Sequence, residues 1–160
     1  FGGIGQATAR LARACGVRLA AHDPALAPGH PIARELGVEW LDLEPLLAAA
    51  DVVSLHLPLA HATRGLLDGR RLGLMQRGAV LINTARGGVV DEAALAELLR
   101  TGHLGGAALD VYAVEPLPAA SPLAGAPNLI LTPHVAGVTR ESNTRVSDLI
   151  AERVIEFLSH

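Results

Sequence analysis

Three residues with ionisable side chains, Arg86, Glu115 and His134, each follow a short apolar run of the chain. Arginine can bind a carboxylate through two parallel hydrogen bonds. Histidine, with an ordinary pKa of about 6.5, can donate and recover a proton near neutral pH. A neighbouring glutamate can orient an imidazolium and stabilise its charge. An anchoring cation, a proton donor and an orienting anion are what the reduction of a small 2-keto acid requires.

Each of these residues also has an ordinary structural interpretation. A lone arginine at the end of a strand is usually a surface ion-pair partner. A glutamate before a proline, such as Glu115, is usually an exposed loop residue. The catalytic hypothesis therefore depends on joint placement, because the carboxyl ends of parallel strands converge on one edge of a sheet.

The first residues suggest a site for a dinucleotide. Gly2 and Gly5 match the second and third glycines of the G-x-G-x-x-G motif, whose glycines permit a tight turn and close approach to a pyrophosphate at a helix N-terminus. Alone, they would equally suit a helix start without a ligand. Asp23, 18 residues after Gly5 and at the end of the next predicted strand, could accept hydrogen bonds from the adenosine ribose. Because a carboxylate repels a 2′-phosphate, NAD is favoured over NADP.

The elements that must position these residues alternate between helix and strand. Helical spacing and capping signals predict helices over residues 5–15, 31–36, 43–50, 67–75, 91–100 and 139–158. Apolar runs predict strands over residues 17–22, 38–40, 51–57, 79–83, 105–109 and 129–131. These strands rarely alternate polar with apolar residues, as in parallel sheets buried on both faces. We therefore predict an α/β fold with a doubly wound, Rossmann-type parallel sheet.

The predicted sheet is truncated at the N-terminus, because the first strand and the first glycine of the motif would precede Phe1. In the strand order 3-2-1-4-5-6 the first strand is central. Its absence would leave a gap with unpaired backbone groups in the neighbouring strands. We expect the sequence to be a piece of a longer protein that is not stable on its own.

Composition disfavours several classes of protein. The chain has 160 residues, half of them hydrophobic and 18% charged, which suits one domain with a substantial core and not a disordered chain. A net charge of −3 gives no electrostatic case for nucleic acid, and no apolar run approaches the ~20 residues that span a bilayer. The single Cys15 excludes an internal disulfide and suits the cytoplasm; its helical position predicts a buried side chain. The histidines lack metal-ligand spacing, so we expect no metal site.

Three segments, at residues 83–91, 108–116 and 131–137, closely resemble the signatures of the D-isomer-specific 2-hydroxyacid dehydrogenases. Residues 56–66 are similar to the family's cofactor-side loop. The resemblance covers essentially the whole chain. It implies the NAD-binding domain of a two-domain enzyme that transfers a hydride between NAD and a small 2-keto or 2-hydroxy acid, with (R) specificity. Residues 1–138 would form that domain, and residues 139–160 a helix leading back toward an absent substrate domain.

By this resemblance Arg86 would bind and polarise the substrate, His134 would be the acid/base, and Glu115 its partner. Arg86 and His134 would also contact the cofactor, with Asp110 beside the nicotinamide carboxamide. The other expected cofactor contacts are Gly2, Gly3, Ile4, Gly5, Asp23, Pro58, Thr63, Thr84, Ala85 and Gly137. The family commonly forms homodimers. Some relatives act as NAD-responsive corepressors, so a regulatory NAD-binding module without turnover stays open as the alternative.

Overall fold

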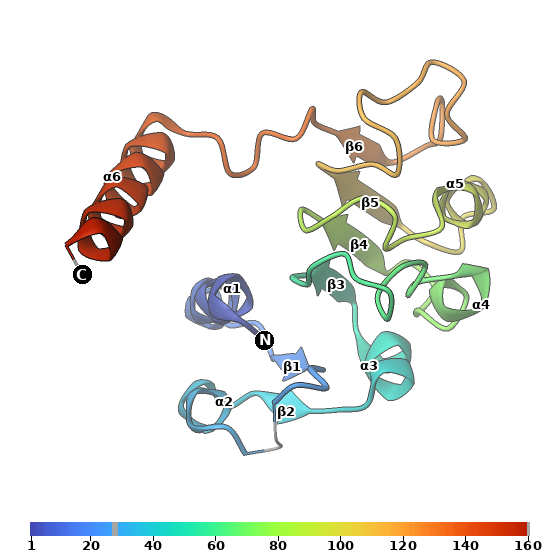
Figure 1. Cartoon of the computed structure of the whole chain (residues 1–160). Helices are drawn as coiled ribbons and strands as arrows, with labels where there is room; N and C mark the ends of the chain where they lie inside the picture. The colour runs from blue at the N-terminus through green and yellow to red at the C-terminus, as the bar shows by residue number, and fades with distance from the viewer. Residues whose placement is uncertain (27–28, 160) are drawn as a thin grey trace.

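Helices and strands alternate along the chain in the computed structural model, which describes residues 1–26 and 29–159 (Figure 1). The helices are α1 (Gly3–Ala14), α2 (Pro31–Leu36), α3 (Leu43–Ala49), α4 (Gly69–Leu72), α5 (Glu92–Arg100) and α6 (Arg140–Leu158). The strands are β1 (Ala20–Ala21), β2 (Glu39–Trp40), β3 (Val52–Leu55), β4 (Val80–Asn83), β5 (Gly106–Leu109) and β6 (Leu129–Leu131). The predicted order of elements is confirmed.

The strands of the described residues form two separate parallel sheets. One contains β1 and β2, and the other has the order β3-β4-β5-β6. The predicted α/β fold with a parallel sheet is therefore confirmed. The two sheets are divided between β1 and β3, which is where the strand order places the expected gap.

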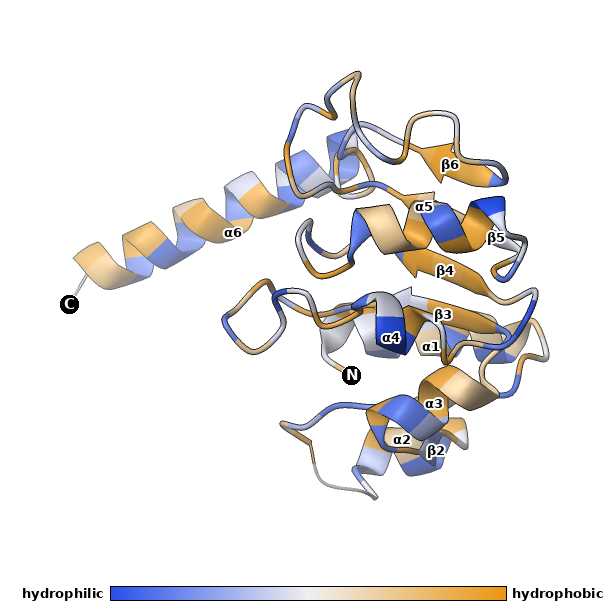
Figure 2. Ribbon diagram, turned by 90° about the vertical axis from the view of Figure 1, so that its right-hand side faces the viewer, coloured by the Kyte–Doolittle hydropathy of each residue, from blue (hydrophilic) through white to orange (hydrophobic). Residues whose placement is uncertain are grey.

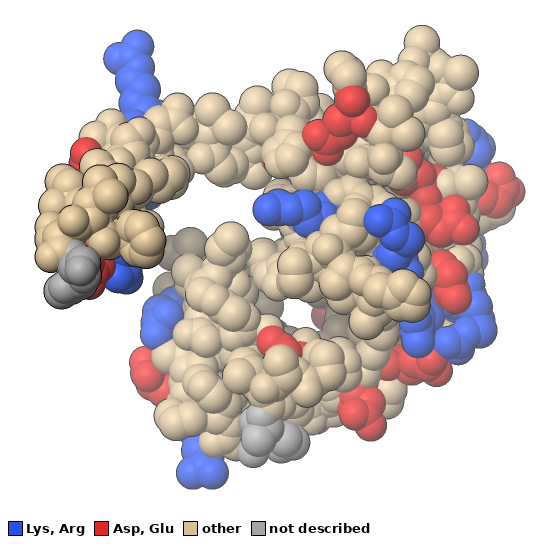
Figure 3. Space-filling model, viewed as in Figure 1, with Lys and Arg blue, Asp and Glu red and all other residues tan. Residues whose placement is uncertain are grey.

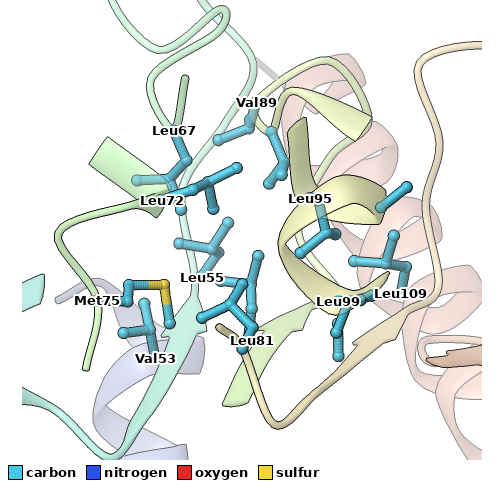
Figure 4. Close-up of a cluster of buried hydrophobic side chains, with 14 of the residues drawn as sticks. Val53, Leu55, Leu67, Leu72, Met75, Leu81, Val89, Leu95, Leu99 and Leu109 are labelled. Atoms are coloured by element: carbon cyan, nitrogen blue, oxygen red, sulfur yellow. The ribbon is translucent and has the colours of Figure 1, made fainter. Parts of the chain in front are cut away.

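The core lies on one face of the four-stranded sheet. Val53 and Leu81 are register partners on this face, and both are buried. Helices α3, α4 and α5 lie on the same side (Figure 1). Figure 4 shows Leu95 and Leu99 of α5 beside Leu109 of β5. Burying a side chain of this size stabilises the fold by about 1.5–3 kcal/mol.

The opposite face of this sheet is open, contrary to the prediction of strands buried on both faces. Ser54, Ile82, Ala108 and Ile130 lie side by side in register on it, and Ile130 is exposed. Helices α1 and α6 lie on this side but stand away from the strands (Figure 1). None of the described residues of α6 is buried, and Figure 2 shows this helix extending from the body with apolar positions along its length.

Helix α1 buries its small residues and exposes its larger apolar ones. Its buried residues are Gly5 and Ala9, whereas Ile4, Leu11 and Cys15 are exposed. The helix packs through small residues, which permit close approach, and its larger apolar side chains point away. The prediction of a buried Cys15 is therefore wrong.

Charged side chains of both signs are interspersed on the face seen in Figure 3, which also shows an open hollow between the α6 arm and the body. No helix within residues 1–26 and 29–159 is long and apolar enough to cross a bilayer. The same residues contain no cluster of three potential metal ligands.

Candidate active site

Glu115 and His134, from the segments that follow β5 and β6, meet at the carboxyl edge of the sheet. The Oε2 atom of Glu115 lies 2.7 Å from Nδ1 of His134. The histidine side chain is 50% exposed and the glutamate side chain 36%. With Nδ1 directed at the carboxylate, the ring's Nε2 remains for a substrate, and no described residue hydrogen-bonds to it. This geometry suits a general acid oriented by a carboxylate.

The Glu115 carboxylate is held in its ionised form. The hydrogen bond with His134 is the largest cause of a lowered Glu115 pKa, and the Tyr112 amide, which donates to Oε1 at 3.0 Å, adds to it. The glutamate is therefore negative at neutral pH and can stabilise an imidazolium.

The backbone of His134 adopts an uncommon conformation, with φ of 56°. Residues other than glycine rarely occupy this left-handed region, and the surrounding structure must stabilise it. Its amide donates to the carbonyl of Thr132 at 3.0 Å. The tight turn aims the imidazole at Glu115.

Asp110 holds the loop around this turn. Its Oδ1 accepts hydrogen bonds from the Thr132 hydroxyl at 2.5 Å and the Val135 amide at 2.9 Å, and Oδ2 accepts from the Ala136 amide at 2.8 Å. The residue is only 3% exposed. Burial alone would raise the Asp110 pKa, but these hydrogen bonds outweigh it and the pKa is lowered. The predicted nicotinamide contact thus lies beneath the His134 loop.

Arg86 lies on a turn built by Asn83, the last residue of β4. The buried Asn83 side chain accepts from the Ala85 amide and donates to the Arg86 carbonyl, each at 3.0 Å. Arg86 itself is exposed, and its Nη1 donates to the Ala85 carbonyl at 2.6 Å. Asn83 is absent from the predicted site, although asparagine before such a turn is a recognisable signal.

The turn that carries Arg86 packs directly against the segment that carries Glu115. A Cβ added to Gly87 would lie 1.6 Å from the carbonyl oxygen of Tyr112, so only glycine fits there. The structure thus brings the Arg86 turn against the Glu115 segment, although no hydrogen bond or ion pair joins the Arg86 side chain to Glu115 or His134 in the described structure.

The predicted phosphate-binding residues lie across the gap, at the start of α1. Space is open around Gly2 and Gly3, where an added Cβ would meet nothing within 4 Å. The free amides of a helix N-terminus with such space fit a phosphate. Gly5 is buried against His56, which follows β3, and Ile4 is exposed.

Asp23 follows β1 on the same side of the gap as the glycines. Its carboxylate accepts hydrogen bonds from the amino group of Phe1 and, at 2.8 Å, from the Ala25 amide. A carboxylate at the end of this strand suits a ribose.

The remaining predicted cofactor residues follow strands of the larger sheet. The Thr63 hydroxyl donates to the Pro58 carbonyl at 2.7 Å and accepts from the Ala60 amide at 2.8 Å, which closes the turn after β3. Thr84 and Ala85 follow β4, and an added Cβ at Gly137 would meet nothing within 4 Å. These residues follow β3, β4 and β6, whereas the predicted phosphate-binding glycines lie at the start of α1.

Comparison with known proteins points to one family. Residues 1–136 match the family described as "D-isomer specific 2-hydroxyacid dehydrogenase, NAD binding domain". The chain is 51% identical over 154 residues to an (S)-sulfolactate dehydrogenase from Chromohalobacter salexigens, which covers 96% of this chain and 50% of that protein. The chain spans about half, or less, of the length of the curated relatives that it matches.

Two solved structures have the same arrangement of elements. An acyclic imino acid reductase in complex with NADPH and D-Arg is 30% identical with a TM-score of 0.88, covering 99% of this chain and 48% of that one. An NAD-dependent formate dehydrogenase from Staphylococcus aureus in complex with NAD is 32% identical with a TM-score of 0.83, covering 100% of this chain and 47% of that one.

Proposed function

The chain belongs to the D-isomer-specific 2-hydroxyacid dehydrogenase family as an NAD-binding domain, and from this premise we propose that the protein transfers a hydride between NAD(H) and a small 2-keto or 2-hydroxy acid. The observation that carries the proposal is the 2.7 Å contact between Glu115 and His134, beside the turn of Arg86. Those three side chains are the minimum set for reducing a keto acid.

The three residues have separate roles in this proposal. Arg86 binds the substrate carboxylate and polarises the keto group. His134 donates a proton from Nε2 to the keto oxygen and recovers it in the reverse direction. Glu115, kept ionised, orients the ring and stabilises its charged form. When bound, NADH supplies the hydride to the carbonyl carbon.

The cofactor would span the gap between the two sheets. Gly2, Gly3, Ile4 and Gly5 would contact the pyrophosphate and Asp23 the ribose. The cofactor-side contacts at the carboxyl edge would be Pro58, Thr63, Thr84, Ala85, Arg86, Asp110, His134 and Gly137. Similar structures are described with NADPH and with NAD, so the preference for NAD depends on the charge of Asp23, which repels a 2′-phosphate.

The proposed stereochemistry is that of a D-hydroxy acid. The relative named (S)-sulfolactate dehydrogenase does not conflict with (R) specificity. In sulfolactate the carbon that carries sulfur outranks the carboxylate, so the (S) label describes the same spatial arrangement that is labelled (R) in lactate. We therefore expect (R)-lactate from pyruvate and (S)-sulfolactate from sulfopyruvate.

Oxidation of NADH by the protein at its full natural length tests the proposal. The panel is glyoxylate, hydroxypyruvate, pyruvate and sulfopyruvate, with the chiral products resolved by chromatography. Replacing His134 with alanine should lower kcat by about 10²–10⁴-fold, the usual contribution of a general acid, and weaken the binding of NADH far less. Equal turnover by the variant would rule out the role of His134.

The alternative is a regulatory NAD-binding module. Tight NADH binding without turnover of any of the four keto acids would favour it over the dehydrogenase.

We also propose that the protein is a cytoplasmic homodimer. The single cysteine suits the reducing conditions of the cytoplasm. Light scattering of the full-length protein would give twice the monomer mass.

A further inference from the structure

Tyr112, which belongs to none of the proposed substrate or cofactor contacts, connects the segments of the site. It lies just beyond β5 and is 7% exposed. Its amide donates to Oε1 of Glu115 at 3.0 Å. Its hydroxyl donates to the carbonyl of Thr132 at 2.7 Å, with the Leu109 carbonyl farther away at 3.2 Å.

The Thr132 carbonyl also receives the amide of His134, at 3.0 Å. The hydroxyl of Tyr112 therefore shares its acceptor with the amide of His134, the residue whose backbone has the positive φ. Two donors to one carbonyl restrict the position of the Thr132 oxygen. Because the His134 amide is one of these donors, they also restrict the direction in which the His134 side chain points.

The hydrogen bonds form a closed ring that passes through both ends of Tyr112. From its amide the ring runs through the Glu115 carboxylate to Nδ1 of His134. From the His134 amide it returns through Thr132 to the Tyr112 hydroxyl. Burial is the largest cause of a raised Tyr112 pKa, so the phenol keeps its proton at neutral pH and remains a donor.

We propose that Tyr112 is a positioning residue, which holds the imidazole of His134 and the carboxylate of Glu115 in a single relative orientation. The proposal builds on the acid/base role of His134 in the proposed function. Tyr112 also contacts the third segment, because its carbonyl packs against Gly87 next to Arg86. One side chain and its own backbone thus fix three loops that come from different strands.

Tyr112→Phe is the test, since it keeps the ring and the amide and removes only the hydroxyl. In the full-length protein, kcat should fall about 3- to 10-fold, the equivalent of one hydrogen bond, while KM for the keto acid and Kd for NADH stay constant. Ser121→Ala is the matched control. It also removes a buried hydroxyl, one that accepts only from the Leu123 amide in the described structure, and should leave kcat unchanged.

A double-mutant cycle tests whether Tyr112 acts through the hydrogen-bonded pair of Glu115 and His134. In a Glu115→Gln background, Tyr112→Phe should lower kcat by a smaller factor than it does in the native protein. A kcat within twofold of the native value, a parallel rise in KM, a loss equal to that in Ser121→Ala, or full additivity in the cycle would each overturn the proposal.

Nitrogen-15 NMR of the labelled histidines gives a readout that needs no turnover, with the His134 signals assigned by their loss in His134→Gln. We expect one neutral tautomer, protonated on Nδ1, in the native protein and a mixture in Tyr112→Phe. Identical spectra would contradict the positioning role even if the protein turned over none of the keto acids. Changed spectra together with no turnover of any keto acid would mean that the proposed function had failed while the positioning role of Tyr112 stood.

Discussion

Asp110 is a buried carboxylate whose three hydrogen-bond donors all belong to the loop around His134. Its pKa is lowered, although burial by itself would raise it, because the charged form receives these donors. Such an anion stabilises an uncommon backbone conformation that the loop sequence alone would not favour.

Replacing Asp110 with asparagine should destabilise the full-length protein by about 2 kcal/mol at pH 7, since an amide cannot accept all three donors. A carboxyl with a lowered native pKa stabilises the fold above its unfolded value of about 3.9, and this contribution is lost as the pH falls through the native pKa. The difference between variant and native protein should therefore shrink near pH 3. Urea unfolding at pH 7 and pH 3 measures the difference in free energy of unfolding between the variant and the native protein. An equal difference at both pH values would contradict the stabilising role of the Asp110 charge.

At the scale of elements, capping residues determine where the helices begin. Oδ1 of Asp91 accepts from the amides of Ala93 at 3.1 Å and Ala94 at 3.0 Å, at the first turn of α5. This helix contributes Leu95 and Leu99 to the core. Its position therefore affects the packing beneath β4 and β5, the strands that lead to Arg86 and Glu115.

Asp91→Ala should lower the free energy of unfolding by about 1 kcal/mol, the usual contribution of an N-cap. Asp91→Asn keeps an acceptor oxygen and should cost only a few tenths. Chemical denaturation of the full-length variants would distinguish them. Equal losses in the two variants would show that the charge, and not the cap, provides the stabilisation.

Local signals explain why the helices and the order of strands could be predicted. Asp91 begins a helix and Gly37, at φ 63°, ends one, and both act on their own neighbours. Local signals were not enough to predict the whole site. The Tyr112 hydroxyl donates to a carbonyl of another segment, and the Asn83 side chain bonds to the backbone of the turn that carries Arg86. No spacing in the sequence indicates that the Tyr112 hydroxyl meets Thr132, a contact across 20 residues.

The burial of whole faces could not be predicted from periodicity. The apolar run of β3 predicted a strand buried on both faces, but Val52 is exposed. Periodicity shows which residues share a face, whereas burial depends on what packs against that face.

At the scale of the molecule, apolar surface is open on one face of the larger sheet and along α6. Ile130, Val146 and Phe157 are among the exposed side chains. The cooperativity of unfolding depends on a continuous core, and here the two sheets share no strand pairing in the described structure.

The 160-residue chain by itself should therefore melt in a broad transition of low cooperativity. Circular dichroism at 222 nm, compared with the calorimetric enthalpy, measures this. The full-length protein is the control, and a sharper transition is expected for it. A single steep transition of the short chain at high temperature would show that the open faces matter little for stability.

The division between the two sheets separates two kinds of specificity. Asp23, the residue proposed to set the choice of cofactor, follows β1, whereas Glu115 and His134 follow β5 and β6, and these sets share no hydrogen-bond partner in the described structure. Substitutions at sites without shared partners combine additively in their energies. On the proposed roles, cofactor preference and proton transfer should therefore diverge independently in evolution, and each should be open to re-engineering without compensating changes in the other.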